Sequence, residues 1–189
     1  MSSHLILFGP STAGKTSLML GLTSYESEYK FTLDRTWTTR PRRFGEGADE
    51  NIFVTKEEFE RKRPDFLFPF QTFPTYEYGI ERPQPLRTRE ARMRILMPVF
   101  AKKFRELVDG PTVFCAVLPF HDDPETVFRT REPNLDTKDM NARLERYYTD
   151  KEEAEASADI CFQNTVGLDK AVERLGATVI RYLQETEDK

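Results

Sequence analysis

The segment Gly9–Thr16, close to the N-terminus, constrains this chain more than any other feature. It matches the pattern G-x-x-x-x-G-K-[ST] at every fixed position. Glycines let such a loop curl so that backbone N–H groups point at phosphate oxygens, and the helix that follows directs the positive end of its dipole to the same anion. The pattern therefore predicts a site for the phosphates of a nucleoside triphosphate. Taken alone, it leaves open a kinase, an ATPase, a GTPase or a chain that has lost its activity.

Individual side chains in this loop have separate expected roles. Lys15 is expected to reach the β- and γ-phosphates, and the Thr16 hydroxyl is expected to join the coordination of Mg²⁺. ATP is the expected donor, although nothing in the loop discriminates against GTP. The residues expected to contact the nucleotide phosphates are Gly9, Ser11, Thr12, Ala13, Gly14, Lys15, Thr16 and Ser17.

Apolar runs on both sides of the loop predict the fold class. Residues 4–8 and residues 113–118 are short, continuous and apolar, which is typical of buried strands. Residues 15–22 have apolar side chains at helical spacing, and residues 89–94 and 138–157 also have helical patterns. Strands that alternate with helices predict an α/β fold of three layers with a central parallel sheet, whose ligands bind at the carboxyl ends of the strands.

Length, charge and cysteine content narrow the function classes. The 189 residues suit a single domain, and the net charge of −4 argues against a general nucleic-acid or membrane-surface partner. No apolar run approaches the roughly 20 residues that cross a bilayer. Cys115 and Cys161 lie in apolar stretches outside any C-x-x-C pair and are expected to be buried, reduced thiols. These features predict a cytoplasmic chain without nucleic-acid or membrane partners; monomer and homodimer both remain open.

A second phosphate site is predicted by residues 36–46, which follow the first strand–helix unit. This segment has three arginines and three threonines. Guanidinium groups bind phosphate through two parallel hydrogen bonds, so such a cluster suits a phosphorylated ligand. A solvated basic loop is the alternative interpretation of the same residues.

From residue 38 onward, several segments of the chain resemble motifs of the guanylate kinase family. Residues 38–46 read T-T-R-P-R-R-F-G-E, and residues 53–59 read F-V-T-K-E-E-F, a capping-box pattern at the start of a helix. The similarity continues with Y-E-Y-G at residues 76–79, N-A-R-L at residues 141–144 and D-I-C-F-Q-N at residues 159–164. The matching motifs follow one another in the same order as in the family, and together they extend over most of the chain.

The resemblance implies an activity and a domain plan. Guanylate kinases transfer the γ-phosphate of ATP to a nucleoside monophosphate, so the family implies an ATP- and Mg²⁺-dependent kinase with a small phosphorylated acceptor, GMP being the first expectation. It also implies a P-loop core formed by residues 1–33 and 86–189. The acceptor-binding insert would comprise about residues 34–85, and the lid about residues 122–142.

The resemblance also implies roles for single residues. Arg131 and Arg143 would be the lid and near-lid arginines that contact the transferring phosphoryl group, with Arg129 as an alternative to Arg131. Asn164 would belong to the ATP site. The catalytic set implied is Lys15, Arg40, Arg131 and Arg143, and the acceptor's phosphate would be held by Thr36, Arg40, Arg43 and Tyr78.

Departures from the family cluster where the acceptor base would be recognised. Pro69 stands at the best-aligned position of the family's guanine-binding Glu, Ile80 at a hydroxyl position and Asn51 at a Tyr position, and residues 97–99 lack the family's acidic pair. Ribose 1,5-bisphosphate phosphokinases resemble this chain in the phosphate loop and in having apolar residues at such positions. A sugar bisphosphate is therefore the alternative acceptor. A non-catalytic module that binds phosphopeptides is the alternative outside enzymes.

Overall fold

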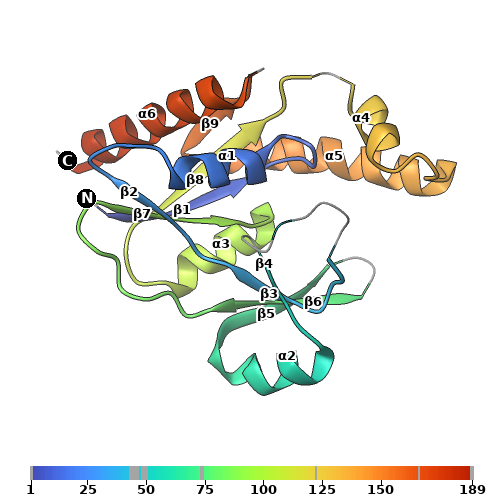
Figure 1. Ribbon diagram of the computed structural model, residues 1–189, viewed down its shortest axis with the longest axis horizontal. Helices are drawn as coiled ribbons and strands as arrows, with labels where there is room; N and C mark the ends of the chain where they lie inside the picture. The colour runs from blue at the N-terminus through green and yellow to red at the C-terminus, as the bar shows by residue number, and fades with distance from the viewer. Residues whose placement is uncertain are drawn as a thin grey trace.

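A computed structural model describes residues 2–42, 47, 51–72, 75–121, 123–165 and 167–187, without the side chain of Arg131. These residues form two sheets with helices around the first (Figure 1). None of the helices within these ranges is long and apolar enough to span a membrane.

The larger sheet is parallel throughout and has the strand order β2-β7-β1-β8-β9. Its strands are β1 (Ser3–Phe8), β2 (Lys30–Leu33), β7 (Glu90–Ile95), β8 (Thr112–Leu118) and β9 (Ile160–Gln163).

Helices cover both faces of this sheet, because successive residues of a strand point to opposite faces. Leu5 and Leu7 pack with α1 and α6, whereas Ile6 and Phe8 pack with α3 and α5. The predicted three-layer α/β fold with a central parallel sheet is therefore confirmed. The helices are α1 (Lys15–Thr23), α3 (Pro98–Leu107), α4 (Pro124–Arg131), α5 (Thr137–Ser157) and α6 (Leu168–Glu187).

A smaller sheet lies beside the core and has the order β4-β3-β6-β5. Helix α2 packs at its far end, at the bottom of Figure 1, and begins with the predicted capping box of Thr55 and Glu58. Every strand of this sheet falls between residues 36 and 81. The strands are β3 (Thr36–Thr38), β4 (Asn51–Phe53), β5 (Phe66–Thr72) and β6 (Tyr76–Glu81), and α2 (Lys56–Lys62) continues into the 3₁₀ turn Arg63–Asp65.

Two predictions from the sequence are wrong. Residues 89–94 are not helical: Arg89 lies in a turn, and residues 90–94 belong to β7, the strand between β1 and β2 in the larger sheet. Cys161 is exposed, whereas Cys115 is buried as expected. The reason for the second error is that β9 is an edge strand, on which Ile160 and Phe162 face the core while Cys161 points away.

Candidate functional site

The phosphate loop occupies the position that the sequence predicts for it, between the end of β1 and the start of α1. Gly9 and Gly14 have φ values of +128° and +83°, and Thr12 also adopts a positive φ of +71°. A positive φ is uncommon for residues other than glycine. Lys15 Nζ donates to the carbonyl oxygens of Gly9, at 2.9 Å, and Pro10, at 2.7 Å. The ammonium group is thus held over the loop.

Asn164 supports the phosphate loop from below. It follows β9 and is buried, and its side-chain Nδ2 donates to the carbonyl oxygen of Ala13 at 2.8 Å. Residues 151 positions apart are thereby connected at the turn that presents the backbone N–H groups. The observed contact is with the loop; direct contact of Asn164 with ATP stays a prediction.

Substitution of Gly14 by Ala should weaken ATP binding about tenfold. A Cβ at this position would lie 2.6 Å from Nδ2 of Asn164, and the φ of +83° adds strain. A left-handed conformation costs a non-glycine residue roughly 1–2 kcal/mol, and the apparent affinity falls with the fraction of competent loop. Calorimetric titration with ATP measures the effect.

Gly167→Ala is a matched control, because Gly167 has a φ of +92° but, apart from its chain neighbours, no atom of the described residues lies within 4 Å of the place that an added Cβ would take. Equal ATP affinities of the Gly14→Ala variant and the unmodified chain would contradict the assignment of the loop.

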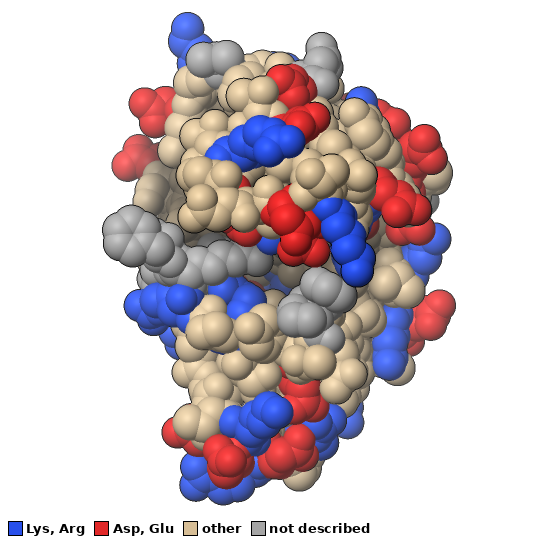
Figure 2. Space-filling view, turned by 90° about the vertical axis from the view of Figure 1, so that its right-hand side faces the viewer, with Lys and Arg blue, Asp and Glu red and all other residues tan. Residues whose placement is uncertain are grey.

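A cavity of about 460 Å³ lies at the carboxyl ends of the core strands, next to the phosphate loop. The surface is hollowed between the core and the smaller sheet, and Lys and Arg side chains lie along this hollow (Figure 2). The predicted site residues that line the cavity are Gly9, Ser11, Lys15, Thr16, Thr36, Arg40, Tyr78 and Arg143.

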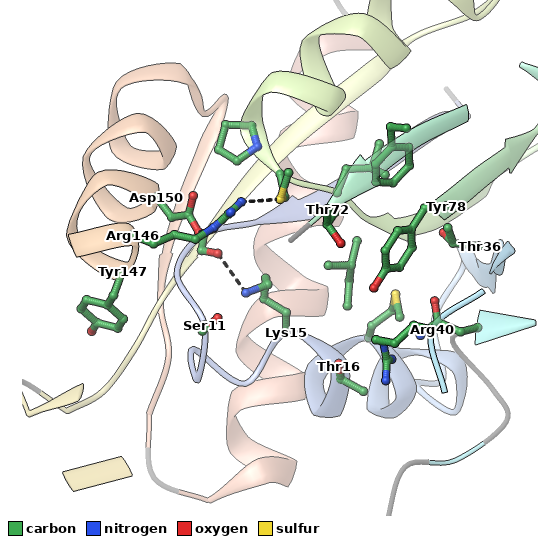
Figure 3. A pocket seen from close by; sticks show the side chains of 18 of the residues that line it. Ser11, Lys15, Thr16, Thr36, Arg40, Thr72, Tyr78, Arg146, Tyr147 and Asp150 are labelled. Atoms are coloured by element: carbon green, nitrogen blue, oxygen red, sulfur yellow. Dashed lines mark hydrogen bonds and ion pairs between the residues drawn. The ribbon is translucent and has the colours of Figure 1, made fainter. Parts of the chain in front are cut away.

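The smaller sheet contributes the side of the cavity where the acceptor is expected (Figure 3). Thr36 comes from β3 and Tyr78 from β6, and Arg40 follows β3 with only 8% of its surface exposed. The Arg40 guanidinium donates to the carbonyl of Pro41 at 2.9 Å and lies 5.4 Å from the ring centre of Phe53. Arg43, the fourth residue predicted here, lies outside the described residues.

The predicted lid and near-lid arginines differ in their positions. Arg143, on α5, lines the cavity, and its two terminal nitrogens donate to Glu132 at 2.8 and 2.9 Å. Arg129, on α4, pairs with Glu125 and is not among the lining residues. The side chain of Arg131 lies outside the described part of the chain. The choice between Arg129 and Arg131 thus remains a prediction.

Sequence reasoning missed the aromatic wall of the acceptor side. Phe70 and Thr72 of β5 line the cavity, and the ring of Phe70 is stacked on that of Tyr78 with centroids 5.3 Å apart. Pro69, the residue aligned with the family's guanine-binding Glu, is exposed and does not line the cavity; Ile80 is fully buried. Alternate side chains of a strand point to opposite faces. If residues 66–72 had been identified as a strand, this alternation would have placed Phe70 and Thr72 on one face and Pro69 on the other.

Three further lining residues from α5 were missed: Arg146, Tyr147 and Asp150. They lie three, four and seven positions after Arg143, which is the spacing of one helix face. Partial burial raises the pKa of the Asp150 carboxyl, while the charges of Arg146 and Lys15 lower it less strongly. The helix face thus presents two cations and a carboxylate to the phosphate loop.

Comparisons with known proteins agree with this geometry. No family model matches the sequence. The chain is 39% identical over 83 residues to a guanylate kinase of Hydrogenovibrio crunogenus; the match covers 42% of this chain and 39% of that protein, so the chain spans about two fifths of the curated relative. Its fold is similar to the crystal structure of a guanylate kinase from Anaplasma phagocytophilum, with a TM-score of 0.64 and 20% identity over 97% of this chain and 86% of that one. The chain therefore has the fold of that guanylate kinase structure, and about two fifths of its sequence is similar to a curated guanylate kinase.

Proposed function

We propose that this protein is an ATP-dependent kinase that phosphorylates a nucleoside monophosphate, with GMP as the first expected acceptor. One observation carries the proposal: residues of the phosphate loop, the predicted acceptor residues Thr36, Arg40 and Tyr78, and one face of α5 line the same cavity of about 460 Å³. That arrangement suits in-line transfer between two bound phosphates, because positioning and charge stabilisation supply most of the catalysis in such reactions. The names of the two similar proteins support the same acceptor.

In the proposed reaction, an oxygen of the acceptor's phosphate attacks the γ-phosphorus of ATP. The bond from the γ-phosphorus to the β,γ-bridging oxygen breaks, and its electron pair leaves with ADP. A dianionic acceptor phosphate requires no proton transfer, so the chain needs no protein nucleophile or general base. Lys15 and Arg143 would stabilise charge on the γ-phosphoryl oxygens, and Arg40 would orient the acceptor.

The oxygen donors beside the loop fit a hard cation. Thr16 lines the cavity next to Lys15, and together with phosphate oxygens its hydroxyl would hold Mg²⁺. Bound Mg²⁺ would neutralise charge on the β- and γ-phosphates. No cluster of three or more His, Cys, Asp or Glu side chains occurs among residues that the structure describes.

A second candidate acceptor is ribose 1,5-bisphosphate, and the wall of the cavity favours it. Phe70, Ile95, Leu96 and Met97 are apolar residues that line the cavity, whereas Pro69 is exposed and does not line it. Thr72 and Asn51 are polar residues that also line the cavity. A site discriminates between bases through hydrogen bonds to their edges, and an apolar wall supplies few of them.

An ADP-release assay with ATP and Mg²⁺ tests both acceptors. The panel is GMP, dGMP, AMP, UMP, CMP and ribose 1,5-bisphosphate. Turnover with GMP well above the other nucleotides is the expected result. Turnover with the sugar bisphosphate alone would replace GMP by the second candidate, and no turnover with any acceptor would leave the phosphopeptide-binding module as the alternative.

The same proposal includes the domain bounds, the cellular location and the assembly state of the chain. We assign the core to residues 1–33 and 86–189, the acceptor-binding insert to about residues 34–85 and the lid to about residues 122–142. The chain would act in the cytoplasm as a monomer or homodimer, without nucleic-acid or membrane partners.

A further inference from the structure

Arg146 stands out among the cations that line the cavity. Both terminal nitrogens of Arg143 are engaged by the carboxylate of Glu132, at 2.8 and 2.9 Å. Arg146, nearly one turn further along α5, makes two weak contacts with the residues that the structure describes: its Nη2 contacts the Sδ of Met97, and its Nε lies 3.6 Å from Oδ2 of Asp150. A thioether sulfur is a weak acceptor. The guanidinium group of Arg146 therefore keeps much of its capacity to bind an anion.

Asp150 lies where two positive groups converge. Its side chain is 17% exposed, compared with 50% for that of Arg146. Arg146 approaches it from the same helix, and Lys15 acts on it electrostatically from the phosphate loop. Figure 3 shows Arg146 and Asp150 projecting from α5 toward Lys15, with the Asp150 carboxylate between the two cations. A carboxylate between a guanidinium and an ammonium group marks a position that suits an anion.

That position coincides with the expected place of the terminal phosphate. Lys15 is the residue of the loop expected to reach the β- and γ-phosphates. Because Arg146 and Lys15 line the same cavity, an anion bound by Lys15 is within the region that Arg146 faces. A partly buried carboxylate at this place would compete with a phosphate oxygen for the same cations.

We propose that Arg146 is a further catalytic residue, which binds the γ-phosphoryl group of ATP together with Lys15, and that the Asp150 carboxylate occupies this anion position until ATP displaces it. The inference rests on the proposed function, since it assumes a nucleoside triphosphate in the phosphate loop. During transfer, Arg146 would stay in contact with the γ-phosphoryl oxygens while the bond to ADP breaks and the bond to the acceptor oxygen forms. Neither Arg146 nor Asp150 exchanges a proton in this step.

Calorimetric titrations with ATP and ADP test the inference without any acceptor. Arg146→Ala should weaken ATP binding about tenfold and leave ADP binding within about twofold, because only ATP has the γ-phosphate. Asp150→Asn should strengthen ATP binding about fivefold, because it removes the competing negative charge while keeping the shape of the side chain. Arg146→Lys should recover part of the lost ATP affinity, since it restores the charge but not the planar fork.

Lys170→Ala is the control, because Lys170 is an exposed cation of α6 that lies outside the assigned lid and does not line the cavity. Its ATP and ADP affinities should equal those of the unmodified chain. With an acceptor that turns over, Arg146→Ala should also lower kcat about 30-fold while thermal unfolding stays unchanged.

Three outcomes would overturn the inference. Equal losses of ATP and ADP affinity in Arg146→Ala would assign Arg146 a merely structural role. Unchanged or weaker ATP binding by Asp150→Asn would remove Asp150 from the anion position. If the unmodified chain bound no ATP, the inference and the proposed function would fail together, whereas ATP binding without turnover on any acceptor would contradict the kinase and leave these affinity differences as the test of Arg146.

Discussion

Replacement of Lys15 by alanine is expected to lower the rate of phosphoryl transfer about a thousandfold. Removal of one preorganised donor from the place where transition-state charge develops costs roughly 10²–10³ in rate, and Lys15 is the cation of the phosphate loop itself. Its ammonium group lies within 2.9 Å of two loop carbonyls and lines the cavity. Single-turnover measurements with saturating ATP and the acceptor found in the panel give the rate of transfer.

The Lys15 variant should unfold at nearly the same temperature as the unmodified chain, because this side chain packs against the loop surface rather than in the core. Lys30→Ala, which removes an exposed lysine of β2 outside the cavity, is the control for the loss of one positive charge. Transfer at an undiminished rate in Lys15→Ala would rule out the mechanism proposed here.

Replacement of Arg40 by alanine is expected to raise the KM for the acceptor about 100-fold and the KM for ATP less than about threefold. Hydrogen bonds to charged groups contribute roughly 1.5–3 kcal/mol, and 1.4 kcal/mol corresponds to a factor of ten. Arg40 is 8% exposed and lines the cavity on the side of the smaller sheet, across from the phosphate loop. Steady-state kinetics with each substrate varied in turn measure both constants.

Because Arg40 is buried, its loss could also disturb the smaller sheet, so Arg40→Lys is measured beside it. Lysine keeps the charge but cannot form two parallel hydrogen bonds to phosphate, and should give an intermediate KM for the acceptor. If the KM for ATP rose as much as that for the acceptor in both variants, Arg40 would have to be placed at the donor phosphates instead.

Local sequence signals predicted the features that depend on neighbouring residues. The phosphate loop and the capping box of Thr55 and Glu58 are examples, because each is formed by backbone and side-chain groups a few positions apart. The buried strands at residues 4–8 and 113–118 were also predictable, since a continuous apolar run needs no distant partner to indicate burial.

Local sequence signals could not predict that β7 is a buried strand of the larger sheet. Residues 89–94 contain three arginines, and charged residues are rarely buried unless they are paired. In the folded chain, Arg92 is within 3.0 Å of Glu90, and Arg94 is within 3.1 Å of Asp34. The partner of Arg94 is 60 positions away, so the pairing that permits a charged central strand exists only after β2 and β7 lie side by side.

The candidate site likewise has some features that the sequence predicts and others that depend on the tertiary structure. From the order of short motifs along the chain, the sequence by itself predicted the phosphate loop and the residues Thr36, Arg40 and Tyr78, which line one cavity in the folded chain. Only the tertiary structure decided that Phe70, Arg146 and Asp150 face the same cavity and that Pro69 does not. The physical reason is that strand register and helix rotation determine which side chains reach a shared space, and both are set by packing between elements that are distant in sequence.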